Sequence, residues 1–367
     1  MNGEDIRSIV ERMGLVVKNR LLVLVKAMTA TVCMVAATAA CADIPRTAEG
    51  LPDLTGTYDV ATLTPVQRPV IYGDNLLLTK EAAQKIEADE KARRIEGQEA
   101  SNPDREAPPE GGDGSAGAAG NVGGYNSFWI DRGENAFSID GKFRTSIITN
   151  PKNGRRPKLT EAAQTRRLQR IAVFRPNTGD AWWLGRDGPG PYDDPEARPM
   201  GERCLLGFGS TAGPPMLPVL YNNVKRIVQT LTHVMILIEM NHDARIVRLN
   251  SEHAPADVKK WLGDSIGWWE GDTLVIDTTN FGHRPGTENL HVVERFTRTD
   301  ENTLGYSFTV DDPSSYTSSW SGEYPWPATS DKVYEYACHE GNYALGNILR
   351  GARLLEADAH AAGASGE

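Results

Sequence analysis

The stretch HVMILIEMNHDARIVRL, residues 233–249, decides how this chain folds. Its first half is almost entirely apolar, which is typical of a strand buried on both faces of a sheet. Its second half carries five polar side chains, namely Glu239, Asn241, His242, Asp243 and Arg245. If strand alternation continues through this half, all of them except His242 lie on one face.

Charges on a buried face are costly unless they are paired. We therefore expect Arg245 to pair with Asp243 or Glu239, in the wall of a cavity. The alternative is that the strand leaves the core at this point and the polar row is a hydrated face. His242 falls on the apolar face, where a histidine is more often a satisfied core residue than a catalyst.

Further strands follow at the spacing of β-hairpins. The turn signals EGDT and DENT separate some of them, and LGYSFTV puts alternate residues from Leu304 to Val310 on one face. No long helix intervenes, so a parallel βαβ sheet is not expected. The fold class is mainly β, an antiparallel meander that closes into a lipocalin-like barrel or forms a sandwich. The expected strands are 224–230, 233–240, 243–249, 273–279, 291–298, 303–310 and 333–339.

The rest of the chain divides by composition. Residues 1–42 read as a signal peptide, and 43–124 hold an extended segment, a short helix at 78–98 and a Gly/Pro-rich loop. Residues 125–353 form the β-rich core, and 354–367 are expected to be a disordered tail. The irregular segment 175–222 is too long for an ordinary connection, so it is expected to cover one end of the core.

Composition and the N-terminus indicate where the protein works. The 367-residue chain has a net charge of −10, which argues against a nucleic-acid partner. Basic residues precede a short apolar run and the small-residue motif ACA at 40–42, as in an export signal. The expected location is periplasmic or secreted, without a stable membrane span after processing. Lipid anchoring through Cys41 is the less favoured alternative, because Thr38 stands where a branched aliphatic residue is expected.

Processing leaves two cysteines, Cys204 and Cys338. In an oxidising compartment they are expected to form a disulfide, with two separate buried thiols as the alternative. The bridge would bring Arg203 close to His339 and Glu340. That set could perform acid/base chemistry or bind an anion, or it could be a structural ion-pair cluster around the bridge.

Other polar residues recur on the expected strands. In ENLHVVERFTR, His291 and Arg295 face one way while Glu294 and Phe296 face the other. Tyr336 and Trp269 could contact a ligand, although tryptophans also seal the ends of barrels. The candidate catalytic residues are Glu239, Asp243, His291 and His339. The candidate substrate-binding residues are Arg203, Arg245, Arg295, Tyr336, Trp269 and Glu340.

No metal or other cofactor is expected. The mature chain has no HExxH motif and no paired-cysteine motif, and no two of its histidines are closely spaced. A site built from His242, His291 and His339 on separate strands stays open as an alternative.

Three functions fit these residues. The first is an acid/base enzyme, a lyase, isomerase or hydrolase, acting on a small organic substrate in a β-barrel cavity. The second is a lipocalin-like carrier of an apolar ligand. The third is a structural envelope protein. The oligomeric state is left open.

Several long blocks resemble a broad family of exported proteins of Gram-negative bacteria whose function is not established. The blocks include GERCLLGFG, EMNHDAR, GDSIGWWEGDTLV and YEYACHEGNY, and the resemblance covers roughly 51–353. It implies export and one shared architecture, and it assigns no catalytic residue.

Overall fold

The computed structural model describes residues 44–97, 130–172, 179–207, 213–282 and 287–364. The expected signal peptide, Cys41 and the Gly/Pro-rich loop at 102–124 lie outside these ranges. From Arg46 onward the described residues form one compact unit.

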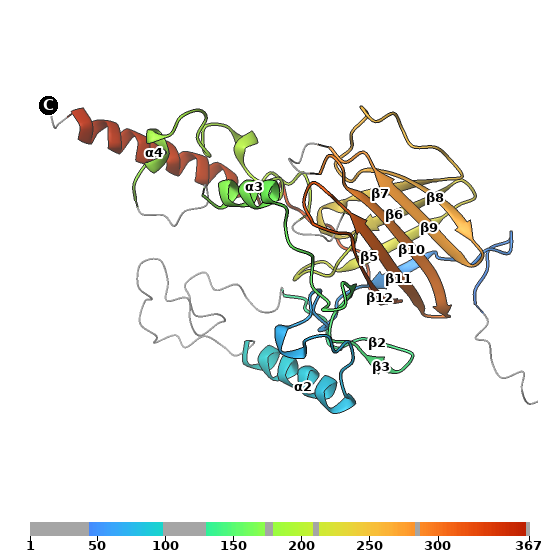
Figure 1. The fold of residues 1–367 in the computed structure, drawn as a ribbon. Coiled ribbons are helices and arrows are strands. Elements are labelled where there is room, and N and C mark those ends of the chain that lie inside the picture. The colour runs from blue at the N-terminus through green and yellow to red at the C-terminus, as the bar shows by residue number, and fades with distance from the viewer. Residues whose placement is uncertain (1–43, 98–129, 173–178, 208–212, 283–286, 365–367) are drawn as a thin grey trace, which may run out of the picture. The chain divides into compact units, whose positions relative to one another are not determined.

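A ten-stranded sheet dominates this unit (Figure 1). Its spatial order is β1-β5-β6-β7-β8-β9-β10-β11-β12-β4. Neighbouring strands are antiparallel, except that β7 and β8 run parallel. The strands are β1 (Gly56–Asp59), β4 (Ile148–Asn150), β5 (Val224–Gln229), β6 (His233–Ile238), β7 (Ala244–Leu249), β8 (Asp264–Glu270), β9 (Thr273–Thr279), β10 (His291–Asp300), β11 (Thr303–Asp311) and β12 (Trp320–Pro327).

The sheet curls into a half-barrel that does not close. Its nearest approach to closure is a single bridge between Tyr58 in β1 and Ala328, just after β12. The backbone N–H of Thr329 also donates to Thr57 O at 2.9 Å. We call this meeting of β1 with the end of β12 the seam. The prediction of a mainly β, barrel-like antiparallel fold is therefore confirmed, with an open half-barrel in place of a closed one.

Helices and short elements complete the unit. Thr79, Thr160 and Asn342 cap three helices, because their side-chain oxygens accept backbone N–H groups of the first turns. These helices are α2 (Lys80–Gly97), α3 (Glu161–Ala172) and α4 (Tyr343–Ala364), and the 3-10 turns are η1 (Val70–Tyr72), η3 (Trp182–Gly185), η4 (Pro195–Ala197) and η5 (Met240–His242); β2 (Ser138–Ile139) and β3 (Lys142–Phe143) form a separate hairpin. None of the helices that the structure describes is long and apolar enough to cross a membrane.

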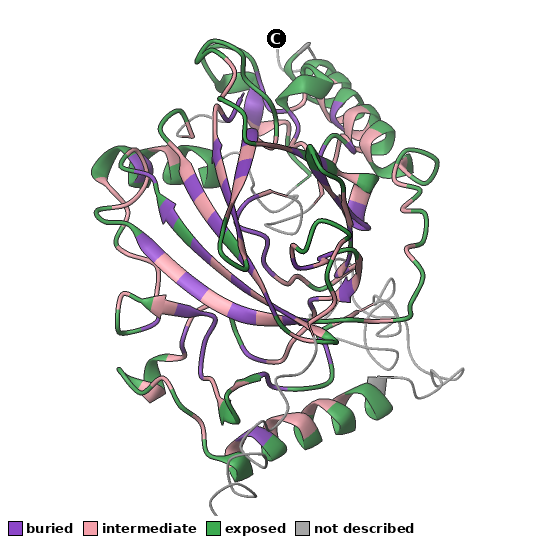
Figure 2. Ribbon diagram, turned by 90° about the vertical axis from the view of Figure 1, so that its right-hand side faces the viewer, coloured by how far each residue is buried: buried purple, intermediate pink, exposed green. Residues whose placement is uncertain are grey.

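Three expectations about individual elements are wrong. Residues 333–339 form no strand, and β8 and β12 were not expected. Tryptophan, glycine and proline within β8 and β12 obscure the alternation that predicted the other long strands. The tail expected at 354–367 is helical as far as Ala364, because α4 continues through it. The alternation expected in β11 is confirmed, since Leu304, Tyr306, Phe308 and Val310 are all buried. Figure 2 shows such alternation as changing colours along the strands.

The alternation expected through residues 233–249 is also wrong, because a turn interrupts it. Asn241 and His242 adopt left-handed backbone angles, with φ of 62° and 53°. The turn makes β6 and β7 an antiparallel hairpin in which Arg245 stands opposite Ile236. Arg245 therefore shares the inner face with the apolar residues of β6, whereas Ile246 is 51% exposed.

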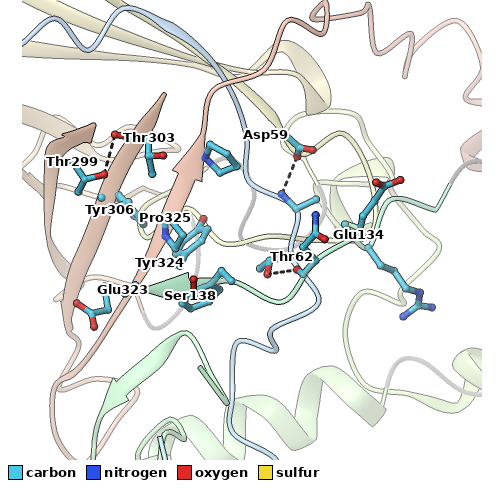
Figure 3. Close-up of a pocket in the computed structure, with 18 of the residues that line it drawn as sticks. Asp59, Thr62, Glu134, Ser138, Thr299, Thr303, Tyr306, Glu323, Tyr324 and Pro325 are labelled. Carbon is cyan, nitrogen blue, oxygen red and sulfur yellow. Dashed lines mark hydrogen bonds between the residues drawn. The ribbon is translucent and has the colours of Figure 1, made fainter. Parts of the chain in front are cut away.

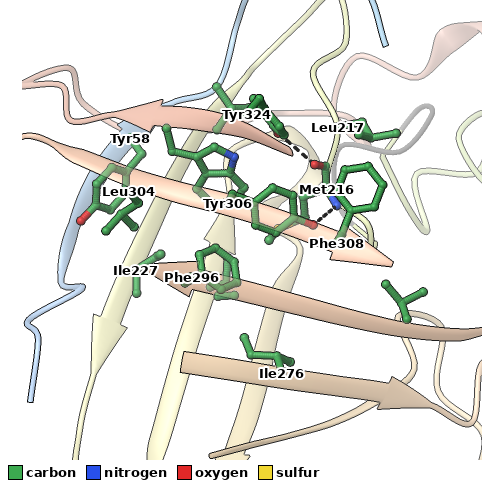
Figure 4. Close-up of a cluster of buried hydrophobic side chains, with 14 of the residues drawn as sticks. Tyr58, Met216, Leu217, Ile227, Ile276, Phe296, Leu304, Tyr306, Phe308 and Tyr324 are labelled. Atoms are coloured by element: carbon green, nitrogen blue, oxygen red, sulfur yellow. Dashed lines mark hydrogen bonds between the residues drawn. The ribbon is translucent and has the colours of Figure 1, made fainter. Parts of the chain in front are cut away.

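The inner face of the sheet is filled by the chain itself. Met216, which follows a cis Pro214–Pro215 bond, is fully buried in the core cluster. Its backbone N–H donates to the Tyr306 hydroxyl at 2.9 Å, and its carbonyl accepts from the Tyr324 hydroxyl at 2.9 Å (Figure 4). Tyr306 in β11 and Tyr324 in β12 thus hold Met216 inside the curl, through side-chain hydrogen bonds to its backbone.

Beside this segment lies a buried ion pair. Arg245 Nη2 is 2.6 Å from Glu294 Oε2, and their side chains are 1% and 0% exposed. The Tyr306 hydroxyl donates to Glu294 Oε1 at 2.7 Å, and Arg245 also reaches Ser265 and Thr278. Arg245 therefore pairs across the curl with β10, and not with Asp243 or Glu239 as the sequence suggested.

Breaking this pair should be costly, because one charge would stay buried without a partner. We expect Arg245→Met to lower the free energy of unfolding by about 3–5 kcal/mol. Adding Glu294→Leu should restore most of the loss, since apolar replacement of a whole buried pair is often neutral. Chemical denaturation of the single and double variants measures both effects.

The control is Arg295→Met. Arg295 pairs with Glu270 at 2.8 Å where both side chains are 45% exposed, so the loss should stay below about 1 kcal/mol. Equal losses for Arg245→Met and Arg295→Met would contradict a structural role for the buried pair.

Candidate functional site

The polar residues of the 239–243 turn hold two distant segments of the chain. Asn241 Nδ2 donates to Cys204 O at 3.1 Å, and Asp243 Oδ2 accepts from Gly207 N at 3.1 Å. On the other side, Glu239 Oε1 accepts from Tyr334 N at 3.1 Å. These side chains bind backbone groups, so Glu239 and Asp243 serve as anchors in the structure.

His242 completes this set, since its Nε2 accepts from the backbone N–H of Tyr336 at 2.9 Å. Tyr336 itself packs against the core cluster. The two anchored segments are joined by the Cys204–Cys338 disulfide, whose Cα atoms are 5.7 Å apart. The disulfide expected from the sequence is confirmed.

The neighbours of the disulfide do not form the expected cluster. Arg203 lies 3.8 Å from Glu196 Oε1 and donates to the Glu196 carbonyl. His339 and Glu340 are exposed, and the described residues give them no hydrogen bond or ion pair to Arg203. Asn342, which the sequence did not single out, donates to Glu202 O at 2.7 Å and fixes this corner.

His291 and Arg295 share one face of β10, as the sequence indicated, but that face is the outer face of the sheet and not the inside of a barrel, where His291 was expected to act. His291 Nε2 is 2.6 Å from Asp277 Oδ2, and His253 Nε2 is 2.8 Å from Asp277 Oδ1. The other ring nitrogen of His253 is 3.1 Å from Asp264 Oδ2. These contacts form a surface network that the sequence did not reveal, because it joins three separate strands and a loop.

Asp264 is the buried end of that network. Burial alone would raise its pKa, but hydrogen bonds from Lys260, Ala254 N and His253 outweigh burial and hold the pKa well below the usual range. No group of three or more His, Cys, Asp or Glu side chains in the described part of the chain is arranged to hold a metal ion. Trp269 packs against the core cluster.

A large cavity lies at the seam. It has a volume of about 1100 Å³ and is bounded by β10–β12, residues 59–62 and residues 130–140. Most of the side chains that the strands contribute belong to the outer face, among them Thr297, Ser307 and Glu323. Figure 3 shows Thr299, Thr303 and Glu323 on one side, with Asp59, Thr62 and Glu134 across from them. We call this hollow the seam pocket.

The seam pocket is strongly acidic. Arg94 and Arg132 are the basic residues in its lining, and Arg94 is already paired with Glu134 at 2.6 Å. Thr62, Ser138, Thr297, Thr299, Thr303 and Ser307 add hydroxyl groups. The lining carboxylates are Asp59, Asp131, Glu134, Asp140, Asp300, Glu323 and Asp331.

Hydrogen bonds hold two of the lining carboxylates in place at the seam. Asp131 accepts from Asn223 Nδ2 at 2.9 Å, and Asp59 Oδ1 accepts from Ala61 N at 2.9 Å. Burial raises the pKa of Asp59, and the negative charges of Asp131 and Asp331 raise it further. A carboxyl whose pKa is raised by like charges gains from a cation placed beside it.

Lys225 in β5 stands opposite Tyr58 of β1 in the sheet, next to the strand residue Asp59 that lines the pocket. It is fully buried, and burial lowers its pKa to about 7, although the charges of Glu239, Asp59, Asp243 and Asp131 act in the opposite direction. Glu239 and Asp243 therefore affect the seam through Lys225. Sequence reasoning missed Lys225 and Asp59, since each reads as an ordinary strand residue until β1 and β5 are paired.

The comparisons found no family model, no curated protein and no solved structure that matches the chain. The resemblance to exported Gram-negative proteins therefore stays a prediction from the sequence blocks.

The lowered pKa of Lys225 predicts a pH dependence of stability. Between pH 7 and about 10.4 the unfolded chain holds a proton on this amine that the folded chain has lost. The free energy of unfolding should therefore rise with pH across this window, with a contribution of roughly 3–5 kcal/mol from this group. In Lys225→Met that contribution should vanish, as measured by urea denaturation at several pH values.

Lys332→Met is the matched control, because Lys332 is exposed. Its pH profile should follow that of the unchanged protein. If Lys225→Met also kept the unchanged profile, burial would not be depressing the Lys225 pKa.

Proposed function

We propose that this protein is exported and binds a small, polar organic molecule with a cationic group in the seam pocket. The observation that carries the proposal is the composition of the lining, where seven carboxylates and several hydroxyls surround about 1100 Å³. A drug-sized or smaller ligand fits a cavity of this size. An ammonium group would satisfy the carboxylates, and ligand hydroxyls would pair with the threonines and serines.

The polar lining favours this ligand over the apolar one that a lipocalin-like carrier would hold. The inner face of the half-barrel, where an apolar ligand would lie, is occupied by Met216 and Leu217. The Arg245–Glu294 pair lies on the same face. An apolar ligand that entered there would have to displace the hydrogen-bonded Met216 segment. It would also disturb the hydrogen bonds around the buried charges.

Export is supported by the disulfide and by the N-terminal sequence. A Cys204–Cys338 bridge is stable in an oxidising compartment such as the periplasm or the extracellular space. The N-terminus of the processed protein, read by mass spectrometry, distinguishes cleavage near residue 42 from acylation of Cys41.

Acid/base catalysis is the second candidate function, and the raised pKa of Asp59 favours it. A carboxyl whose pKa is raised holds its proton more firmly than an exposed aspartate does, and it is also the stronger base once ionised. Lyase, isomerase and hydrolase reactions all use such a group. Asp59 then takes the role that the sequence suggested for Asp243 or Glu239.

Binding is tested by thermal denaturation with a panel of small amines, each paired with the alcohol of the same shape. We expect some amines to raise the Tm and their alcohols to have no effect. Asp331→Asn should lower the affinity for the amine that binds best by about tenfold or more, because a charge-assisted hydrogen bond is lost. Isothermal titration measures the affinity.

Asp311→Asn serves as the control for this test. Asp311 is an exposed residue at the end of β11 that does not line the pocket, so the affinity should not change. Alcohols binding as tightly as amines would contradict the proposed ligand class. Equal affinity of the Asp331→Asn and unchanged proteins would contradict the proposed site.

Catalysis is tested on the ligand that binds best. We expect product, detected by mass spectrometry, to form with the unchanged protein and to be lost in Asp59→Asn. A bound ligand recovered without chemical change would leave binding as the function and remove the enzyme candidate.

A further inference from the structure

A separate surface carries two adjacent, highly exposed aliphatic side chains. Val70 and Ile71 open η1 (Val70–Tyr72), and they are 76% and 86% exposed. Single exposed aliphatic residues are common on protein surfaces, whereas contiguous exposed apolar surface marks an interaction site. We call η1 with its preceding Pro69 the apolar tip.

Hydrogen bonds fix the residues on both sides of the apolar tip. Arg68 is almost fully buried, and its Nη1 donates to Lys152 O at 2.6 Å and to Gly73 O at 3.4 Å. Its backbone N–H donates to Gly154 O at 2.8 Å. Arg155 Nη1 in turn donates to Arg68 O at 2.9 Å. Both ends of the tip are therefore held, and the two aliphatic side chains are presented outward by a fixed backbone.

The segment that holds the base of the tip is basic. The segment 152–158, KNGRRPK, holds Arg68 through the contacts just described and carries four basic residues. Lys152 and Lys158 are exposed. Residues 68–74 and 152–158 together carry five basic side chains and one acidic one, Asp74, which lies 4.0 Å from Lys152 Nζ, in a chain whose net charge is −10.

We propose that the apolar tip docks on the surface of an anionic phospholipid bilayer. Val70 and Ile71 would enter the boundary between headgroups and acyl chains, while Lys152 and Lys158 remain among the phosphates. Apolar groups that dip into this boundary beside lysines are the usual basis of peripheral membrane binding.

A bilayer fits the tip better than a folded protein partner does. A stable protein interface buries about 800 Å² on each partner and relies on a matching pocket. Two side chains on a narrow turn provide much less area. A fluid bilayer needs no complementary pocket, and it supplies the negative charge that matches the lysines.

The test is co-sedimentation with lipid vesicles, using processed protein in which Cys41→Ser removes any acyl anchor. Vesicles contain either pure phosphatidylcholine or phosphatidylcholine with one-third phosphatidylglycerol. We expect binding to the anionic vesicles that weakens as salt is added. Val70→Ser with Ile71→Ser should reduce it about tenfold or more, and so should Lys152→Glu with Lys158→Glu.

Leu168→Ser with Ile171→Ser is the matched control, because both residues are exposed aliphatics, on α3, at 68% and 51%. Binding should not change in this variant. The proposal is overturned if the unchanged protein does not bind anionic vesicles or binds neutral vesicles equally well. It is also overturned if Val70→Ser with Ile71→Ser binds anionic vesicles as tightly as the unchanged protein. Self-association that Val70→Ser with Ile71→Ser abolishes, without vesicle binding, would identify a second copy of the chain as the partner instead.

Discussion

The ion pair between Arg245 and Glu294 is the constraint on which the inside of the half-barrel depends. Each charge is desolvated by the curl of the sheet, so each requires the other. Tyr306 ties the pair to the segment around Met216, because its hydroxyl donates to Glu294 and accepts from Met216 N. Polar pairing and the inserted segment thus form one connected interior.

A lipocalin-like barrel would bind its ligand inside the barrel. Here the chain itself fills the inner face, so the candidate site lies elsewhere. The seam pocket lies instead where β1 meets the end of β12 through one bridge. There the sheet lacks the continuous hydrogen bonding of its centre, and side chains from the outer face and from residues 130–140 surround the seam pocket. The incomplete closure of the barrel therefore accounts for both the position and the polarity of the candidate site.

The 239–243 turn relates this site to the rest of the molecule. It fixes the segments on both sides of the disulfide through four side chains. Glu239 and Asp243 also act on the buried amine of Lys225, whose charge in turn affects Asp59. Polar residues that resembled a catalytic row are better explained as anchors whose charges influence the pocket from behind.

The sequence predicted those features of the fold that depend on neighbouring residues along one strand or hairpin. The alternation of β11, the hairpin spacing and the shared face of His291 and Arg295 all follow from strand geometry. The partner of Arg245 could not be predicted, because the left-handed residues Asn241 and His242 break the alternation and turn Arg245 inward. The seam pocket was missed because Asp59, Asp131 and Asp331 come from distant segments, which meet where β1 contacts the end of β12. The disulfide was predictable because removal of the expected signal peptide would leave a single possible pair.

The most direct test of this account is a crystal structure of the processed protein with the amine that binds it most tightly. The account predicts electron density for the amine in the seam pocket, with its nitrogen among Asp59, Asp131 and Asp331 and with Met216 still bonded to Tyr306 and Tyr324. Density inside the half-barrel, next to Arg245 and Glu294 and in place of Met216, would contradict it.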